Sequence, residues 1–224
     1  MVSRAPVLPR PRPQRVTLEG RYARLEPLGA AHAEGLFRAS SGEDAAARFA
    51  YLPVDPPADL AEMRDRIARA ADKEDPLFSA VIDRASGEAG GRQSLMRITP
   101  EHGVIEIGHI LWGPAIARTR VATEAFFLSA CYVFDALGYR RLEWKCNDLN
   151  EPSKAAARRF GFSFEGIFRQ HMWVKGANRD TAWFAIVDRE WPPIRAAFER
   201  WLQPENFDAA VRQRARLETK AAAG

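Results

Sequence analysis

The sequence predicts a single α/β domain, in which a central mixed β-sheet is covered by helices on both faces. Residues 77–112 contain three β-prone runs separated by turn residues, a pattern that predicts adjacent antiparallel hairpins. Strand and helix patterns then alternate. The crossover from strand 104–112 through helix 120–137 to strand 140–146 should be right-handed and parallel. A chain of 224 residues fits one large domain with a substantial core.

The first half of the chain predicts one strand and two helices ahead of the hairpins. Residues 21–28 alternate between apolar and polar side chains, as a half-buried strand does. Residues 30–40 carry one apolar helical face. Residues 58–72 carry another, directly after Pro56 and Pro57. The hairpin strands are expected at 77–84, 91–98 and 104–112.

The second half predicts three helices with clear ends. Helix 120–137 stops at Gly138, a favourable residue just past a helix. A short helix begins with Pro152 and ends before Gly161. The remaining elements are expected as strands 140–146, 163–170 and 181–188 and a final helix 192–202.

The composition excludes several classes of protein. Hydrophobic residues make up 46% and charged residues 28%, which is typical of globular proteins. No apolar run reaches the roughly 18 residues of a membrane-spanning helix, and no secretory signal precedes the domain, so we expect a cytoplasmic protein without a membrane partner. Cys131 and Cys146 are too few for a disulfide framework, and we interpret both as small buried hydrophobic residues. Four histidines and two cysteines show no zinc spacing, so we expect no metal.

The net charge of +4 originates at the N-terminus. Four prolines there predict a disordered or extended arm over residues 1–19. We interpret this arm as solubilising and do not expect nucleic-acid binding, because the excess charge lies outside the folded part. Residues 20–203 then form the domain, and residues 204–224 form a polar tail that packs loosely at most. The basic residues of the arm are Arg4, Arg10, Arg12 and Arg15.

Four short motifs between Gly103 and Trp191 occur in a characteristic order. They are IEIG at 105–108, ATEA at 122–125, N-x-P-S at 150–153 with GF at 161–162, and EG-x-x-R at 165–169 with D-x-x-x-F at 180–184 and EW at 190–191. In this order the motifs resemble the GNAT superfamily of acyl-CoA-dependent N-acyltransferases, and within it the RimJ/RimL-like branch, over about residues 20–192.

The resemblance implies both a fold and an activity. The fold would be GNAT-like, with a mostly antiparallel, twisted sheet that is splayed at the cofactor site. The activity would be transfer of an acetyl group from acetyl-CoA to a primary amine, either a protein N-terminus or a small-molecule amine. Homodimers are common among similar proteins, so a homodimer is compatible with the sequence.

The cofactor site is expected where strand 104–112 runs into helix 120–137. Free backbone N–H groups and the positive end of the helix dipole suit a pyrophosphate there. By resemblance, acetyl-CoA would be bound by Ile110, Leu111, Trp112, Arg118, Thr119, Arg120, Val121, Ala122, Thr123, Asn150 and Ser153.

The loop at this site departs from the family pattern Gln/Arg-x-x-Gly-x-Gly/Ala. Ala122 matches, but Ala117 replaces the first residue and Arg120 replaces the central glycine, which would allow close backbone approach to phosphate. Arg118 and Arg120 offer charge-assisted hydrogen bonds instead. Two alternatives stay open: the arginines lie in solvent or pair with Glu124, or the domain has lost CoA and acts as a non-catalytic binding or scaffold domain.

Two residues on strand 104–112 are candidate general bases. Amines are largely protonated at neutral pH, so N-acylation needs a group that takes a proton. Glu106 aligns with the strand glutamate that serves this role in some GNAT enzymes, and a solvent-facing or ion-paired glutamate is the alternative. His109 should face the other side of the strand unless a bulge intervenes, which Gly108 would allow. A structural histidine is the alternative for His109.

The resemblance also implies a candidate acid for the departing thiolate. Many GNAT proteins place a tyrosine at the position of Ala157, so that tyrosine is absent here. The RimL-like branch instead uses a serine, which corresponds to Ser153. A capping role is the alternative for Ser153 and for Asn150, whose expected role is a cofactor contact.

Residues on the substrate side are harder to assign. Trp112, Arg169, His171 and Trp173 lie near strand ends that flank the expected cleft, where they would line an acceptor pocket or pack in the core. Arg179 and Asp180 belong to the branch's pattern and are interpreted as structural ion-pair residues.

Overall fold

The computed structural model describes residues 7–219, and its centre is an eight-stranded sheet in the order β1-β2-β3-β4-β5-β6-β8-β7. Every neighbouring pair is antiparallel except β5 and β6, which are parallel, as the crossover predicts. The strands are β1 (Leu18–Glu19), β2 (Ala23–Pro27), β3 (Leu77–Asp83), β4 (Ala89–Thr99), β5 (Val104–Trp112), β6 (Arg141–Asn147), β7 (Ser163–Val174) and β8 (Ala177–Val187).

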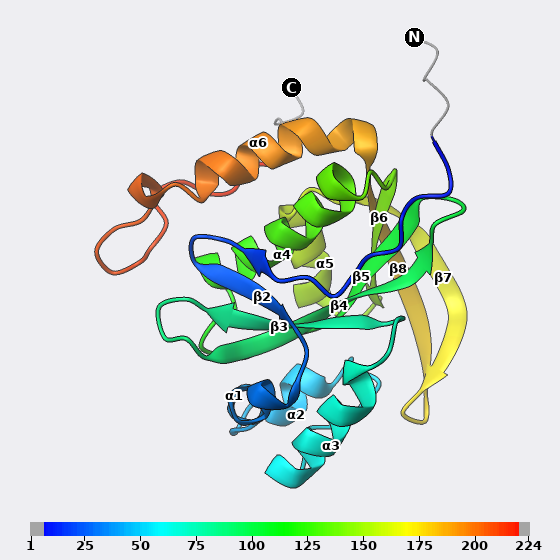
Figure 1. Ribbon diagram of the computed structural model, residues 1–224. Coiled ribbons are helices and arrows are strands. Elements are labelled where there is room, and N and C mark those ends of the chain that lie inside the picture. Colours follow the sequence, from blue (N-terminus) through cyan, green and yellow to red (C-terminus); the bar gives the residue numbers. More distant parts are fainter. Residues whose placement is uncertain (1–6, 220–224) are drawn as a thin grey trace.

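Helices cover both faces of this sheet (Figure 1). One face, here called the α3 face, carries α1 (Ala33–Ser40), α2 (Ala45–Phe49) and α3 (Leu60–Ala71). The opposite face, here called the α4 face, carries α4 (Arg120–Cys131), α5 (Glu151–Arg159) and α6 (Trp191–Trp201). The predicted mixed α/β class is therefore confirmed.

Two elements differ from the sequence-based expectation. The five-residue helix α2 was not predicted, because so short a helix has no apolar periodicity to detect. The expected helix 120–137 is α-helical only to Cys131 and continues as a π-helical turn over Tyr132–Ala136. It still ends before Gly138, whose φ of 68° favours glycine.

Aromatic side chains fill the larger core, which lies under α4 and α6. Phe126 and Phe160 stack with ring centroids 4.5 Å apart, and Phe198 lies 5.6 Å from Phe126. A smaller core joins α1 and α3 to the other face of the sheet and includes Leu36 and Met63. Strand β4 contributes residues to both cores, Leu95 and Ile98 to the larger and Ala89 to the smaller.

The ends of the described chain correct two expectations. Residues 7–19 do not form a free arm: Arg10 N–H donates to the carbonyl of Pro100 at 2.9 Å, and β1 pairs with β2. Part of the C-terminal tail packs on α6, because Phe207 and Leu217 are buried. Residues 1–6 and 220–224 of the predicted arm and tail lie outside the described residues. Within residues 7–219, no helix has the length and apolar character needed to cross a bilayer.

Candidate active site

Strands β5 and β6 separate in the middle of the sheet. They pair at only three positions, the last of which joins Glu106 to Glu143. Both strands continue beyond it, to Trp112 and Asn147, with no further pairing between them in the described structure. Backbone N–H and C=O groups on the facing edges therefore lack strand partners and are free to bind a ligand. The end of β5 leads through a short loop to the N-terminus of α4.

Glu106 lies where this separation begins. Its neighbours Ile105 and Ile107 pack in the core under α4, so its side chain points to the α3 face. The carboxylate is buried, with Oε2 3.0 Å from Lys145 Nζ and 3.3 Å from Arg97 Nε. Burial raises the pKa of Glu106, while Lys145 and Arg97 oppose that rise. This places a proton-accepting group with a raised pKa at the start of the gap.

Lys145 is shared between two carboxylates. Its ammonium lies 2.7 Å from Glu143 Oε2 as well as beside Glu106, and 3.8 Å from the ring centroid of Trp183. Its side chain is only 6% exposed. Lys145 therefore links Glu106 to Glu143, and each carboxylate has a second cation beside it, Arg97 at Glu106 and Arg141 at Glu143.

A β-bulge brings His109 to the same face as Glu106. On β4, Ser94 pairs with Gly108 while Arg92 pairs with Leu111, so two residues of β5 stand opposite one of β4. His109 adopts a φ of 49° in this bulge. The bulge that the sequence allowed at Gly108 is present one residue later, and it overturns the expectation that Glu106 and His109 point to opposite faces.

His109 is neutral at physiological pH in this environment. Burial, together with smaller effects of the nearby cations Arg92, Arg97 and Lys73, lowers its pKa to about 4. Because the ordinary value is about 6.5, the unfolded chain binds more protons than the folded chain between pH 4 and 6.5. The contribution of His109 to folding stability is therefore complete above pH 6.5 and is lost as pH falls towards 4.

This linkage predicts a measurable difference between two histidine variants. Between pH 7.5 and 5.0, wild-type protein should lose about 2 kcal/mol more unfolding free energy than His109→Gln in urea titrations. His102, which is exposed, provides the control: His102→Gln should follow the wild type. Equal losses for wild type and His109→Gln would contradict the lowered pKa.

Ser153 lies at the other side of the gap, on the α4 face. Asn150 Oδ1 caps α5 by accepting the Ser153 N–H at 3.1 Å, so the capping alternative for Asn150 is present in the structure. The Ser153 hydroxyl accepts the indole N–H of Trp144 at 2.9 Å, and Trp144 belongs to the separated part of β6. The Ser153 hydroxyl also hydrogen-bonds the side chain of Cys146, the next-but-one residue of β6.

The loop before α4 is built around Thr119. Its Oγ1 accepts the N–H of Val121 at 3.1 Å and donates to the carbonyl of Ile116 at 2.7 Å. Arg118 is exposed, has a φ of 62° and makes no ion pair with any residue in 7–219. The N–H groups of Arg120 and Ala122 have no hydrogen-bond acceptor in the described chain. Together these groups form a cationic site at a helix N-terminus, suited to an anion.

The side chain of Arg120 is held by two aromatic rings. Its guanidinium stacks over Tyr22 at 4.1 Å and over Phe207 at 5.2 Å, which turns the side chain towards the C-terminal segment. The alternative in which the loop arginines pair with Glu124 is wrong. Glu124 instead accepts backbone N–H groups at the start of β2.

Sequence reasoning missed Arg159 as a cation near this loop. Its Nη1 donates to Thr123 Oγ1 at 3.1 Å, and no acidic residue of the described chain pairs with it. Burial lowers its pKa. Arg159 is 36 residues from Thr123, and only the packing of α5 against α4 brings the two together.

Comparison with known proteins decides the family. A family model described as an acetyltransferase (GNAT) domain matches residues 23–163, more than half of the chain. The chain belongs to the GNAT acetyltransferases. The crystal structure of a GCN5-related N-acetyltransferase from Brucella melitensis is 59% identical, has a TM-score of 0.92, and matches over 94% of this chain and 96% of its own.

Two more distant relatives agree with this assignment. A Bacillus licheniformis protein named uncharacterized N-acetyltransferase p20 is 28% identical over 149 residues, which are 63% of this chain and 80% of that protein. A Salmonella typhimurium acetyltransferase that modifies the N-terminal serine of ribosomal protein L7/L12 is 18% identical, with a TM-score of 0.65 over 75% of this chain and 96% of its own. At that identity the likeness shows the fold alone.

The other predicted residues of this GNAT domain divide between core and surface. Leu111, Val121 and Ala122 are buried, Ile110 packs against the larger core, and the Trp112 indole N–H donates to Gln93 at 3.2 Å. Their side chains are therefore structural, and the backbone of this stretch is what faces the gap. Among residues 7–219, no cluster of His, Cys, Asp or Glu is arranged to hold a metal ion.

The residues predicted on the substrate side are spread more widely than expected. Trp173 is 75% exposed on β7, so it belongs to neither core nor pocket, and Arg169 is also exposed. His171 points to the α3 face and lies 3.0 Å from Thr181 Oγ1. Asp180 accepts the Gln170 N–H at 2.7 Å instead of forming an ion pair.

The two cysteines have the environment of structural residues. Cys146 is buried and Cys131 is half-buried. Burial raises the pKa of both thiols, that of Cys131 to about 12, so neither is ionised near neutral pH.

Proposed function

We propose that this GNAT domain transfers an acetyl group from acetyl-CoA to a primary amine in the cytoplasm. The observation that carries the proposal is the gap between β5 and β6, with Glu106 on its α3 face and Ser153 on its α4 face. Acetyl-CoA would supply an acetyl group activated as a thioester. The α4 N-terminus with Arg118 and Arg159 provides groups suited to its phosphates.

The residues on either side of the gap support direct attack by the amine. Glu106 takes a proton from the ammonium, and the free nitrogen forms an N–C bond to the thioester carbonyl. Backbone N–H groups of β5 stabilise the charge that develops on the carbonyl oxygen. The C–S bond then breaks, the nitrogen loses its second proton, and the departing thiolate takes up that proton while the Ser153 hydroxyl donates a hydrogen bond to it. Positioning of the two substrates contributes much of the rate.

Calorimetric titration with acetyl-CoA tests the first requirement of this proposal. Wild-type protein should bind with a micromolar Kd, and Arg118→Ala should weaken binding about tenfold, the value of one charge-assisted hydrogen bond to phosphate. Arg120→Ala is the matched control. Because its guanidinium stacks on Tyr22 and Phe207, it should leave Kd unchanged within a factor of about two.

Other outcomes would change the interpretation. No binding at millimolar acetyl-CoA would contradict the proposal and favour a non-catalytic scaffold domain. Equal weakening by both variants would show that Arg120 leaves its aromatic site to contact phosphate.

A further inference from the structure

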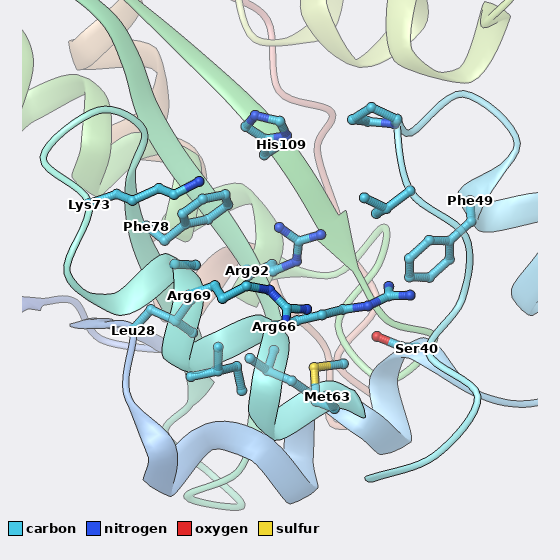
Figure 2. A pocket seen from close by; sticks show the side chains of 15 residues that line it. Leu28, Ser40, Phe49, Met63, Arg66, Arg69, Lys73, Phe78, Arg92 and His109 are labelled. Atoms are coloured by element: carbon cyan, nitrogen blue, oxygen red, sulfur yellow. The ribbon is translucent and has the colours of Figure 1, made fainter. Parts of the chain in front are cut away.

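A cavity of about 330 Å³ lies on the α3 face, between the sheet and helices α1 to α3 (Figure 2). One side of it is apolar and includes Phe49, Met63 and Phe78. The other side is basic, and Figure 2 shows these side chains converging on the cavity from α3, β4 and β5. The basic residues are Arg66, Arg69, Lys73, Arg92 and His109.

Most of the positive charge in this cavity is uncompensated. No acidic residue lines it. Arg66 pairs with Glu62 and donates to the carbonyl of Asp55 at 2.6 Å. The side chains of Arg69, Lys73 and Arg92, by contrast, form no ion pair with any residue in 7–219.

Arg92 is the most buried of these cations. Its guanidinium lies 5.3 Å from the ring centroid of Phe78 and makes no hydrogen bond within the described residues. Burial, with a smaller effect from Arg66, lowers its pKa to about 10, so it remains charged at neutral pH. The side chain is half-buried and no acidic residue of the described chain pairs with it, so its donors are available to an anion that enters the cavity. Its planar fork matches a carboxylate or a phosphate in two parallel hydrogen bonds.

The cavity adjoins the reaction centre of the proposed function. His109 lines it and lies three residues after Glu106, on the same face and in the separated part of β5. His109 therefore connects the cavity to the part of β5 that carries Glu106.

The cavity is partly covered on its outer side and remains half open to solvent. Residues 49–55 run along it, and side-chain contacts hold this segment. The Tyr51 hydroxyl donates to the carbonyl of Leu149 at 3.1 Å, and Lys175 Nζ lies 3.0 Å from the carbonyl of Phe49 and 2.8 Å from Asp55 Oδ1. The volume of the cavity is at the lower end for ligand sites, which favours a small molecule over a polypeptide terminus.

We propose that the acceptor is a small amine that also carries an anionic group, a carboxylate or a phosphate, which Arg92 binds while an apolar part packs on Phe78. This inference rests on the proposed acetyl transfer. Lys73 and Arg69 add to the positive potential around the anion.

The test uses probes that lack an amine, with the full-length protein and without acetyl-CoA. Calorimetry compares 3-phenylpropionate with the neutral 3-phenylpropionamide. Wild-type protein should bind the carboxylate at least tenfold more tightly than the amide, and Arg92→Gln should abolish that preference. Arg64→Gln is the control, because Arg64 is on the same helix as Arg66 and Arg69 but pairs with Glu34 outside the cavity. It changes the net charge equally and should keep the preference.

Phenyl phosphate, titrated in parallel, identifies which anion is preferred; tighter binding of either anion than of the amide supports the proposal. Equal binding of anion and amide, or unchanged binding by Arg92→Gln, would overturn it. Displacement of the carboxylate probe by acetyl-CoA would also overturn it, by assigning Arg92 to the cofactor. These titrations measure binding and not transfer. If the probes bind as expected but a separate assay detects no acetylation of any amine, the proposed function alone is refuted.

Discussion

Replacing Glu106 by glutamine should lower kcat/KM for acetyl transfer by about 100-fold or more. General-base catalysis contributes about 10²–10⁴ in rate. Glutamine keeps the size of the side chain and an oxygen for Lys145 but cannot take up the proton of the ammonium. Release of free CoA thiol with an accepted amine measures the rate, and the Kd of acetyl-CoA should stay unchanged. The loss therefore reports proton transfer and not binding of the thioester.

Glu143→Gln separates this catalytic role from a structural one. Glu143 pairs with Glu106 across the two strands and contacts the same Lys145 ammonium, at 2.7 Å. Its substitution disturbs the ion cluster equally but leaves the proposed base in place, so the rate should change only a few-fold. Comparable losses in both variants would assign Glu106 to structure alone.

The pH profile gives a second readout. The carboxylate form of Glu106 is the active one, and burial raises its pKa. Wild-type kcat/KM should therefore fall as pH decreases through this raised value, because the protonated form accumulates. Glu106→Gln should lack that limb. A limb that persists in the variant would belong to another group.

The sequence predicted the fold well where the evidence was local. Alternating strands with Ser86-Gly87, Pro100 and Gly103 between them gave the hairpins, because turn chemistry and strand period are both read within about ten residues. The parallel crossover followed from chain order and handedness. The prediction for the N-terminal segment was wrong because it depended on a distant contact. Proline content predicted disorder, but the Arg10 N–H donates to the carbonyl of Pro100, 90 residues away.

At the candidate site, too, the sequence predicted features that depend on neighbouring residues and missed contacts between distant ones. Glu106 was identified from its motif, and the bulge from its glycine. The partners that set its environment, Arg97 and Lys145, come from two other strands, and the sequence does not reveal their approach. The apolar face of helix 58–72 predicted its packing but did not single out its cations. Only the packing of α3 on α1 and β3 places Arg66 and Arg69 around the same cavity as Arg92.

Glu124 has the largest predicted effect on stability. Its buried carboxylate accepts three backbone N–H groups in succession, from Arg21 at 2.9 Å, Tyr22 at 2.5 Å and Ala23 at 2.6 Å. Hydrogen bonds to a charged acceptor contribute about 1.5–3 kcal/mol each, and removing the acceptor leaves the donors unsatisfied. Since three such bonds are not additive, Glu124→Ala should cost about 3–4 kcal/mol of unfolding free energy. In a chain of this size that corresponds to a Tm decrease of about 10 °C.

The carboxylate of Glu124 lies directly against Gly20, so a substitution at position 20 tests the same contact independently. A Cβ at position 20 would lie 2.6 Å from Glu124 Oε2 and 2.9 Å from the carbonyl of Ala23, so Gly20→Ala must displace the carboxylate or the strand. It should therefore destabilise the protein as well, and combining it with Glu124→Ala should cost less than the sum of the two single changes. Glu199→Ala, which removes an exposed i,i+4 pair with Arg195, should cost less than about 0.5 kcal/mol in the same unfolding series. If Glu124→Ala were no more costly than Glu199→Ala, the three hydrogen bonds would not hold β2 to α4, and the start of the sheet would depend on its apolar contacts alone.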